Sequence, residues 1–223
     1  FEARHKMITE SLLFQPMHES IANLIHHHLA VQTDQPIIAD LGCGEGSHLH
    51  KILIDEVCPP AIGLGLDISK EGILLAAKKY DHSMWIVGDL AQSPLADQSV
   101  HVILNILSPS NHKEFHRILN PNGFVVKVVP RAGYLKELRV ALRSEEKQYT
   151  NEETVALFKK NYHLADRTTL FYTKKLNQIE LHRLVQMTPL SWTGGPEAIE
   201  SFLSQNTAPI TIDMDILVGL KNG

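Results

Sequence analysis

Acidic residues and glycines recur where short apolar runs of this chain end. The segment Asp40-Leu41-Gly42-Cys43-Gly44-Glu45-Gly46 follows one such run and precedes a helical pattern. Glycines allow a tight turn against which a ligand can press, and the N-terminus of the following helix offers unpaired N–H groups. The spacing is GxGxG, whereas a dinucleotide pyrophosphate site has GxGxxG, so the segment disfavours an NAD-binding site.

Two further acids complete a pattern that is typical of a nucleoside site. Asp67 ends the second apolar run, where a carboxylate can accept hydrogen bonds from both ribose hydroxyls. Asp89 ends the third run and can accept from an exocyclic amine such as that of adenine, with Ile68 and Leu90 against the ring. Ligands of open α/β sheets bind beyond the carboxyl ends of the strands, so these positions predict one shared site. The alternative for Asp67 is a helix-capping carboxylate before Ser69.

The elements that must hold these residues alternate between strands and helices. Buried strands are predicted at 36–41, 61–67, 84–89, 100–107 and 124–129. Helices are predicted between them, through about residue 57, at 70–80 and at 111–119. This alternation indicates an α/β fold with a Rossmann-like, doubly wound, mostly parallel sheet. After a helix at 133–148, strands near 165–173 and 210–220 should extend the sheet, one of them antiparallel, with more helix around 176–186 and 196–204.

The first 35 residues predict an N-terminal helical segment of two helices broken at Pro16, ahead of one domain over 36–223. His26, His27 and His28 are consecutive, so they point to different sides of a helix and do not suit a metal site. We expect no metal in this chain.

Composition narrows the function classes. The 223 residues carry a net charge of −4, which does not favour a polyanion binder, and the hydrophobic content of 43% excludes wholesale disorder. Only Cys43 and Cys58 occur, so a disulfide scaffold and a four-Cys zinc site are excluded within this chain. No apolar run approaches the ~20 residues that span a bilayer. We expect a cytoplasmic protein with no membrane partner, and a start at Phe1 suggests that part of the natural N-terminus is missing.

These motifs resemble the class I S-adenosylmethionine-dependent methyltransferases over roughly residues 36–130. The matching segments are 39–46, 66–69, 88–90 and 115–123. The resemblance implies S-adenosylmethionine as cofactor and S-adenosylhomocysteine as product. The cofactor-binding residues that follow from the spacing and the resemblance are Asp40, Gly42, Gly44, Gly46, Asp67, Ile68, Asp89, Leu90 and Asn105.

A narrower resemblance covers most of the chain. Segments 65–80, 130–138 and 186–192, and Phe14-Gln15-Pro16-Met17 near the start, look like the bacterial guanine-N1 methyltransferases of 23S ribosomal RNA. This resemblance implies ribosomal RNA as partner and methyl transfer to a guanine N1. That family carries an N-terminal four-Cys zinc module, and this sequence contains none, so any zinc would belong to a module outside it.

Basic residues after the fifth strand are the candidates for RNA contact. Lys136, Arg139, Arg143 and Lys147 follow helical spacing and form one stripe, with Arg131 just before it. The alternative is an ordinary solvated helix face with i, i+4 charge pairs.

Methylation at guanine N1 requires that the N1 proton leave and that the base reach the methyl group, so a paired base would be flipped out. At the end of the fourth strand Asn105 is the candidate to orient the guanine edge, and Trp192 and Tyr134 are candidates for stacking. His112 is a weak candidate for the proton acceptor, which the sequence does not identify.

Two rival functions remain open at this stage. A small-molecule or quinone-like acceptor would suit the acidic net charge better, and an enclosed apolar pocket would favour it. A cofactor-binding protein without catalysis is the other alternative, although no bulky residue interrupts the glycine segment. The oligomeric state stays open, with a homodimer as one possibility.

Overall fold

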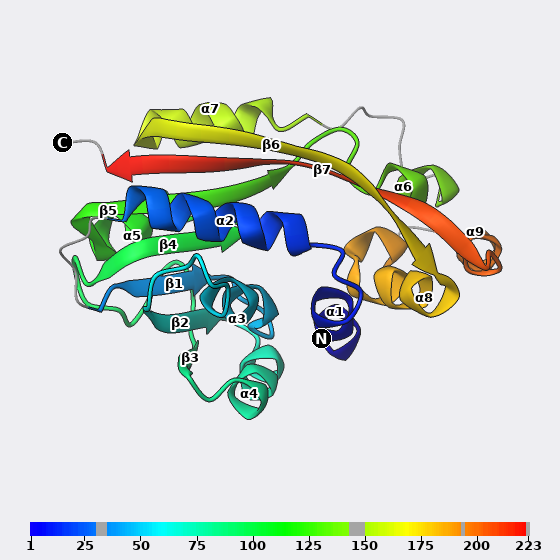
Figure 1. Ribbon diagram of the computed structural model, residues 1–223, viewed down its shortest axis with the longest axis horizontal. Coiled ribbons are helices and arrows are strands. Elements are labelled where there is room, and N and C mark those ends of the chain that lie inside the picture. The colour runs from blue at the N-terminus through cyan, green and yellow to red at the C-terminus, as the bar shows by residue number, and fades with distance from the viewer. Residues whose placement is uncertain (30–34, 143–149, 193–194, 222–223) are drawn as a thin grey trace.

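The computed structural model describes residues 1–29, 35–142, 150–192 and 195–221, which form a seven-stranded sheet with helices on both faces (Figure 1). The strands are β1 (Ile37–Leu41), β2 (Ile62–Asp67), β3 (Ser83–Val87), β4 (Val100–Ile106), β5 (Leu119–Pro130), β6 (Tyr162–Asn177) and β7 (Thr207–Lys221). The α-helices are α1 (Glu2–Thr9), α2 (Gln15–His28), α3 (Ser47–Leu53), α4 (Lys70–Lys79), α5 (His112–Ile118), α6 (Lys136–Ala141), α7 (Glu152–Asn161), α8 (Gln178–Met187) and α9 (Pro196–Leu203). A short 3₁₀ helix follows α8 at Pro189–Trp192.

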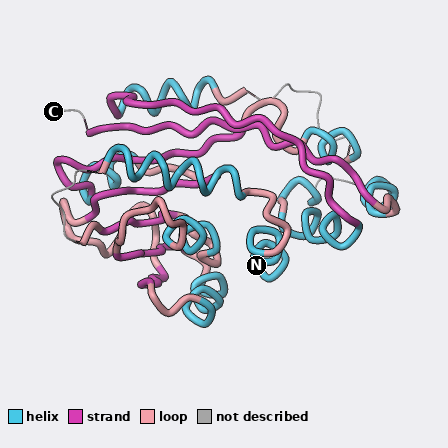
Figure 2. Tube along the Cα trace, viewed as in Figure 1, coloured by secondary structure: helices cyan, strands magenta, loops and turns pink. Residues whose placement is uncertain are grey.

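The strand order is β3-β2-β1-β4-β5-β7-β6. The first five strands are parallel, and β7 pairs antiparallel with both β5 and β6. The predicted mostly parallel sheet with one antiparallel late strand is therefore confirmed, and Figure 2 shows the alternation of strand and helix that produces it. Because β1 lies between β2 and β4, the strand order reverses at β1, and open α/β sheets bind their ligands at such a switch point.

Two hydrophobic layers cover the two faces of the sheet. On one face, alternate residues of β4 and β5, such as Leu104 and Val126, pack under α2, α3 and α8. On the other face, Ile103 and Val125 pack under α5 and α7 together with Phe115. This double burial explains why the parallel strands read as continuous apolar runs in the sequence.

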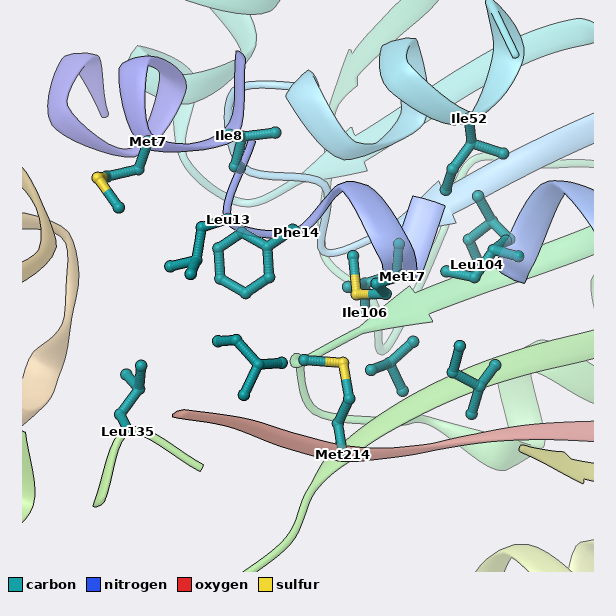
Figure 3. Packing of buried hydrophobic residues seen from close by; sticks show 14 of the residues in the cluster. Met7, Ile8, Leu13, Phe14, Met17, Ile52, Leu104, Ile106, Leu135 and Met214 are labelled. Atoms are coloured by element: carbon teal, nitrogen blue, oxygen red, sulfur yellow. The ribbon is translucent and has the colours of Figure 1, made fainter. Parts of the chain in front are cut away.

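The N-terminal helices belong to the main core. Leu13, Phe14 and Met17 are fully buried, and Figure 3 shows them beside Ile106 of β4 and Met214 of β7. Helix α1 packs against α3 and against α8 from the other end of the chain. The N-terminal segment therefore helps to build the edge of the sheet at which the parallel strands end.

The observed fifth strand differs from the predicted one because it begins at Leu119. The Asn120-Pro121-Asn122-Gly123 turn lies inside it as an irregularity, since Val100 pairs with Leu119 while Val102 already pairs with Phe124. An added Cβ on Gly123 would lie 2.7 Å from the His101 carbonyl oxygen, so a glycine is required where the bulge approaches β4. The late strands are also longer than expected, with 16 residues in β6 and 15 in β7.

Candidate functional site

The glycine segment forms a left-handed loop at the end of β1. Gly42, Gly44 and Gly46 have φ values of 89°, 60° and 77°, which favour glycine. The N–H of Gly42 donates to the Leu66 carbonyl oxygen at 2.8 Å, so the loop is fixed to the end of β2. A Cβ on Gly42 would lie 2.6 Å from Ser108 Oγ, so any side chain there would collide with the segment after β4.

Asp67 joins this loop to the next strand. One carboxylate oxygen accepts from the Gly44 N–H and the other from the Ser69 N–H, both at 2.8 Å. Ser69 itself caps α4 by accepting from the Gly72 N–H at 3.2 Å. Each Asp67 oxygen keeps a second lone pair, so the carboxylate can hold the loop and still accept from two ribose hydroxyls.

The residues expected to hold an adenine follow at the ends of β2 and β3. The Ile68 side chain is 75% exposed, and Leu90 is half-buried. Asp89 is exposed, and one of its oxygens accepts from the Ala91 N–H at 2.8 Å. This leaves an apolar surface and an acceptor-rich carboxylate open to a ligand.

Asp40 is the buried acid of the loop. It is 1% exposed, and within the described residues its Oδ1 atom has no hydrogen-bond partner. Burial raises the pKa of Asp40 to about 7. A buried acceptor without a donor is costly, so a ligand that brings a donor or a positive charge to this place would be stabilised. S-adenosylmethionine carries an ammonium and a sulfonium, and the glycine loop, Asp67 and Asp40 together fit it.

A cavity of about 780 Å³ opens beside the loop. Its lining comes from the carboxyl ends of β1, β4 and β5, from α1, α3, α5 and α7, and from segments before α2, before α6 and after α8. Its lining residues include Gly42, Ser108, Lys127, Tyr134, Glu153 and Pro189. Leu107 and Leu135, which also line it, have φ values of 52° and 53°, a strained conformation that concentrates at functional sites.

Asn105 organises the base of this cavity. It is fully buried, and its Nδ2 group donates to the Leu41 carbonyl oxygen at 3.0 Å and to the Pro109 carbonyl oxygen at 2.9 Å. Its Oδ1 atom accepts from Ser110 Oγ and from Lys127 Nζ. Because protein groups engage both polar atoms, Asn105 is held firmly in place, and its contact with a guanine edge stays a prediction.

Lys127 and Arg4 are the site residues that sequence reasoning missed. Lys127 lies in β5 directly beside Asn105 in β4, and it lines the cavity. Arg4, in α1, forms an ion pair with the buried Glu45 of the glycine loop and also lines the cavity. The apolar pattern of β5 contained a signal for Lys127, since a charged residue in a strand buried on both faces requires a reason.

Two histidines line the cavity and are neutral near pH 7. Burial lowers the pKa of His48, whose Nδ1 atom lies 2.8 Å from Nε2 of His18 in a buried pair. Burial also lowers the pKa of His112, the residue that the sequence suggested as a candidate proton acceptor. The Nδ1 atom of His112 is buried and has no hydrogen-bond partner within the described part of the chain.

The other predicted contacts fall into three groups. Tyr134 lines the cavity, as a stacking residue would, whereas the side chain of Trp192 lies outside what the structure describes. The Arg131 guanidinium forms ion pairs with two carboxylates, with its Nη1 atom 3.2 Å from Asp213 Oδ1 and its Nε atom 3.8 Å from Asp215 Oδ2. Lys136 is exposed and Arg139 is half-buried on α6. Arg143 and Lys147 lie outside the described residues, so the stripe stays a prediction.

Within its described ranges the structure contains neither a metal-binding cluster nor a membrane-spanning helix. No group of three or more His, Cys, Asp or Glu residues is arranged to hold a metal ion there. None of the helices in these ranges has the length and apolar character needed to cross a membrane.

Comparisons with known proteins agree with this arrangement. A family model described as a methyltransferase domain matches residues 38–123. A Bacillus subtilis (strain 168) protein, provisionally named a 23S rRNA (guanine-N1)-methyltransferase, is 42% identical over 99% of this chain and 79% of its own length. The 23S rRNA (guanine(748)-N1)-methyltransferase of Streptomyces fradiae is 33% identical over 73% of this chain and 58% of its own length.

Solved structures share the fold at low sequence identity. The YcgJ protein of Bacillus subtilis superposes with a TM-score of 0.60 and 16% identity, covering 92% of this chain and 99% of that one. A geranyl diphosphate methyltransferase in complex with S-adenosylmethionine gives a TM-score of 0.57 with 14% identity, over 97% of this chain and 89% of that one. At these identities the likeness concerns the fold alone.

Proposed function

Because the chain belongs to the class I S-adenosylmethionine-dependent methyltransferases, we propose that it methylates N1 of a guanine in 23S ribosomal RNA. The cofactor is S-adenosylmethionine, and the chain is similar to relatives named for this RNA reaction over up to 99% of its length. The single observation that carries the proposal is the cavity beside the glycine loop. Met187, Thr188 and Pro189 line it together with Tyr134, and all four lie in the segments of the guanine-N1 resemblance.

We infer how the chain binds the cofactor from the strand ends. Asp67 and the glycine loop would hold the ribose and the methionine part, and Ile68 and Leu90 would cover the adenine. When bound, S-adenosylmethionine supplies an electrophilic methyl group on a positively charged sulfur. The protein then has to position the acceptor in line with that methyl group and exclude water, and positioning of this kind can lower a barrier by about 7–11 kcal/mol.

The cavity suits a single flipped base better than a paired one. Its volume of about 780 Å³ lies in the usual range for small-molecule sites. The neutral His48 and His112 side chains and the Tyr134 ring offer hydrogen bonds and a flat surface, while Lys127 offers a buried amine. A guanine presents a carbonyl oxygen and an N–H side by side on its Watson–Crick edge, so it can use both kinds of group.

A small-molecule acceptor is the second candidate. The demethylmenaquinone methyltransferase of Chlorobaculum parvum is 32% identical over 47% of this chain and 46% of its own length. That match covers less than half of the chain, whereas the match to the rRNA-type relative covers nearly all of it. The cavity lining is also mixed in character, with Arg4, Lys127 and Glu153 among apolar residues, and a quinone ring with a lipid tail would favour a purely apolar one.

Transfer of labelled methyl groups tests the proposal. The protein is incubated with labelled S-adenosylmethionine and either 23S rRNA that lacks the modification, intact large subunits, or demethylmenaquinone. We expect label in RNA as 1-methylguanosine, identified by mass spectrometry of the nucleosides and located by the stop that N1 methylation causes in reverse transcription. Label in the quinone alone, or in no RNA under conditions where the cofactor binds, contradicts the proposal.

A further inference from the structure

Lys127 is a buried lysine in the wall of the cavity. It lies near the carboxyl end of β5 and is 5% exposed. Its Nζ atom donates to the Asn105 Oδ1 atom and to the Ser108 carbonyl oxygen, each at 2.6 Å. Ser108 Oγ in turn donates to the carbonyl oxygen of Leu41, the residue before the glycine loop, so Lys127 is linked to the start of that loop.

Neither of these partners is a carboxylate. Among the residues that the structure describes, no ion pair includes Lys127, although buried ammonium groups are usually paired. Burial lowers the pKa of Lys127 to about 8, so a substantial fraction is uncharged in a slightly alkaline solution. The ionisable groups that line the same cavity are Arg4, His48, His112, Tyr134 and Glu153.

The two hydrogen bonds of Lys127 leave one position on its nitrogen free. Loss of one proton from the three-donor ammonium gives an amine with two N–H donors and one lone pair. Two acceptors, on Asn105 and Ser108, use both donors, and the lone pair is left for a group that enters the cavity. Methyl transfer to guanine N1 needs a base of this kind, because the neutral N1 atom carries a proton and is a poor nucleophile. Among the described residues, the cofactor side of the site supplies no such base.

On the basis of the proposed function, we propose that Lys127 is a catalytic residue that removes the N1 proton of the guanine. The N1–H bond breaks, and its proton forms a bond with the lone pair of Lys127 Nζ. The electron pair left on N1 forms the new bond to the methyl carbon, and the pair of the broken carbon–sulfur bond stays on sulfur. Lys127 ends as an ammonium group, and the methylated base and the thioether product end neutral at these atoms.

His112 is the competing proton acceptor. It lines the same cavity, and its pKa is lowered by burial and by the charge of Lys127, so it is a weaker base than Lys127. Its ring packs edge-on against Phe115 and Tyr162, with centroids 6.2 Å and 5.5 Å away. These contacts pack the His112 ring into the wall of the cavity, whereas the hydrogen bonds of Lys127 orient its lone pair.

Single-turnover methyl transfer to unmodified rRNA, measured from pH 6 to pH 10, tests this role. Lys127→Met removes the base, and Lys127→Arg keeps a positive charge that cannot be deprotonated in this range. Lys113→Met, at an exposed position of α5, is the matched control for a lost lysine. We expect both Lys127 variants to be slower by roughly 100-fold or more, within the range of general base catalysis, and the control to keep the wild-type rate.

The pH profile separates catalysis from structural support. The wild-type rate should rise with pH and level off above about pH 8, where Lys127 is neutral, and Lys127→Met should lose this plateau. NMR titration of ¹⁵N-labelled lysine should show one amine that titrates near pH 8 and disappears in Lys127→Met. Both variants should bind S-adenosylmethionine as the wild type does, which shows that the loop is intact.

The outcomes distinguish the two proposals. A wild-type protein that binds the cofactor but labels no RNA overturns the proposed function. A wild-type protein that labels RNA while Lys127→Arg keeps its rate and its pH profile leaves that function intact and overturns the role of Lys127. Loss of activity in His112→Gln with a normal Lys127→Arg enzyme would move the proton acceptor to His112.

Discussion

Replacement of Asp67 by alanine tests the cofactor site most directly. The Asp67 carboxylate accepts from the backbone N–H groups of Gly44 and Ser69 at 2.8 Å, and its remaining lone pairs are the inferred acceptors for the ribose. Alanine removes all of these acceptors at once. The change therefore acts on the ligand and on the loop that surrounds it.

The expected magnitude follows from these hydrogen bonds. A hydrogen bond to a charged group contributes about 1.5–3 kcal/mol, and because Asp67 is only half-buried we extend this range down to about 1 kcal/mol. Loss of the ribose contact should weaken S-adenosylmethionine binding by about 1–3 kcal/mol, which is roughly a 5- to 150-fold increase in Kd. Asp67→Asn keeps one acceptor oxygen, so its loss of S-adenosylmethionine affinity should be smaller than that of Asp67→Ala.

Isothermal titration calorimetry with S-adenosylmethionine measures the effect. Asp81→Ala, at a well-exposed acid after α4, is the control for the removal of one negative charge and should leave the Kd unchanged. Urea unfolding of the wild type and of these variants reports how much the substitution destabilises the loop itself. An unchanged Kd in a folded Asp67→Ala protein would refute the assignment of Asp67 to the cofactor site.

Three further changes test the tertiary arrangement. Arg4→Ala leaves Glu45 buried without its partner, so we expect the free energy of unfolding, measured by urea titration, to fall by about 3 kcal/mol. Lys6→Ala, at an exposed position of the same helix, is the control and should lower this free energy far less. Gly46→Ala puts a Cβ 2.3 Å from the Trp85 ring at a φ of 77°, so we expect a lower Tm and weaker cofactor binding; an unchanged Tm would contradict the close packing. The pKa of Asp40 is raised to about 7 in the folded protein, so the folded state holds a proton that the unfolded state loses between about pH 4 and pH 7. The free energy of unfolding should therefore fall as the pH rises through this window, and Asp40→Asn should flatten the fall in urea titrations at pH 5 and pH 8.

The fold was accessible to sequence reasoning because its signals are local. The β1 run, the three glycines and Asp67 each depend on neighbours within a few residues, and their placement at adjacent strand ends follows from the parallel sheet. The limits of β5 were wrong because Asn120 to Gly123 form a bulge whose pairing with β4 depends on a partner strand. No local pattern distinguishes such a bulge from a turn that precedes a strand.

The residues around the acceptor required the tertiary structure. Lys127 meets Asn105 across 22 positions of the chain, and Arg4 meets Glu45 across 41. Tyr134 precedes α6 and Pro189 follows α8, yet both line the same cavity. Asn105 bonds to Leu41 and to Lys127, which only the folded chain brings close.

The sequence by itself determined the element order, the glycine loop and the acids that mark the nucleoside site, since strand and turn propensities act over a few residues. Only the tertiary structure decided which side chains close the acceptor cavity. Its lining comes from α1, β4, β5, α7 and the segment after α8, and their meeting is set by the packing of buried apolar residues on both faces of the sheet. Burial also decides the protonation of Lys127 and Asp40, because desolvation depends on everything that surrounds a group and not on its neighbours in sequence.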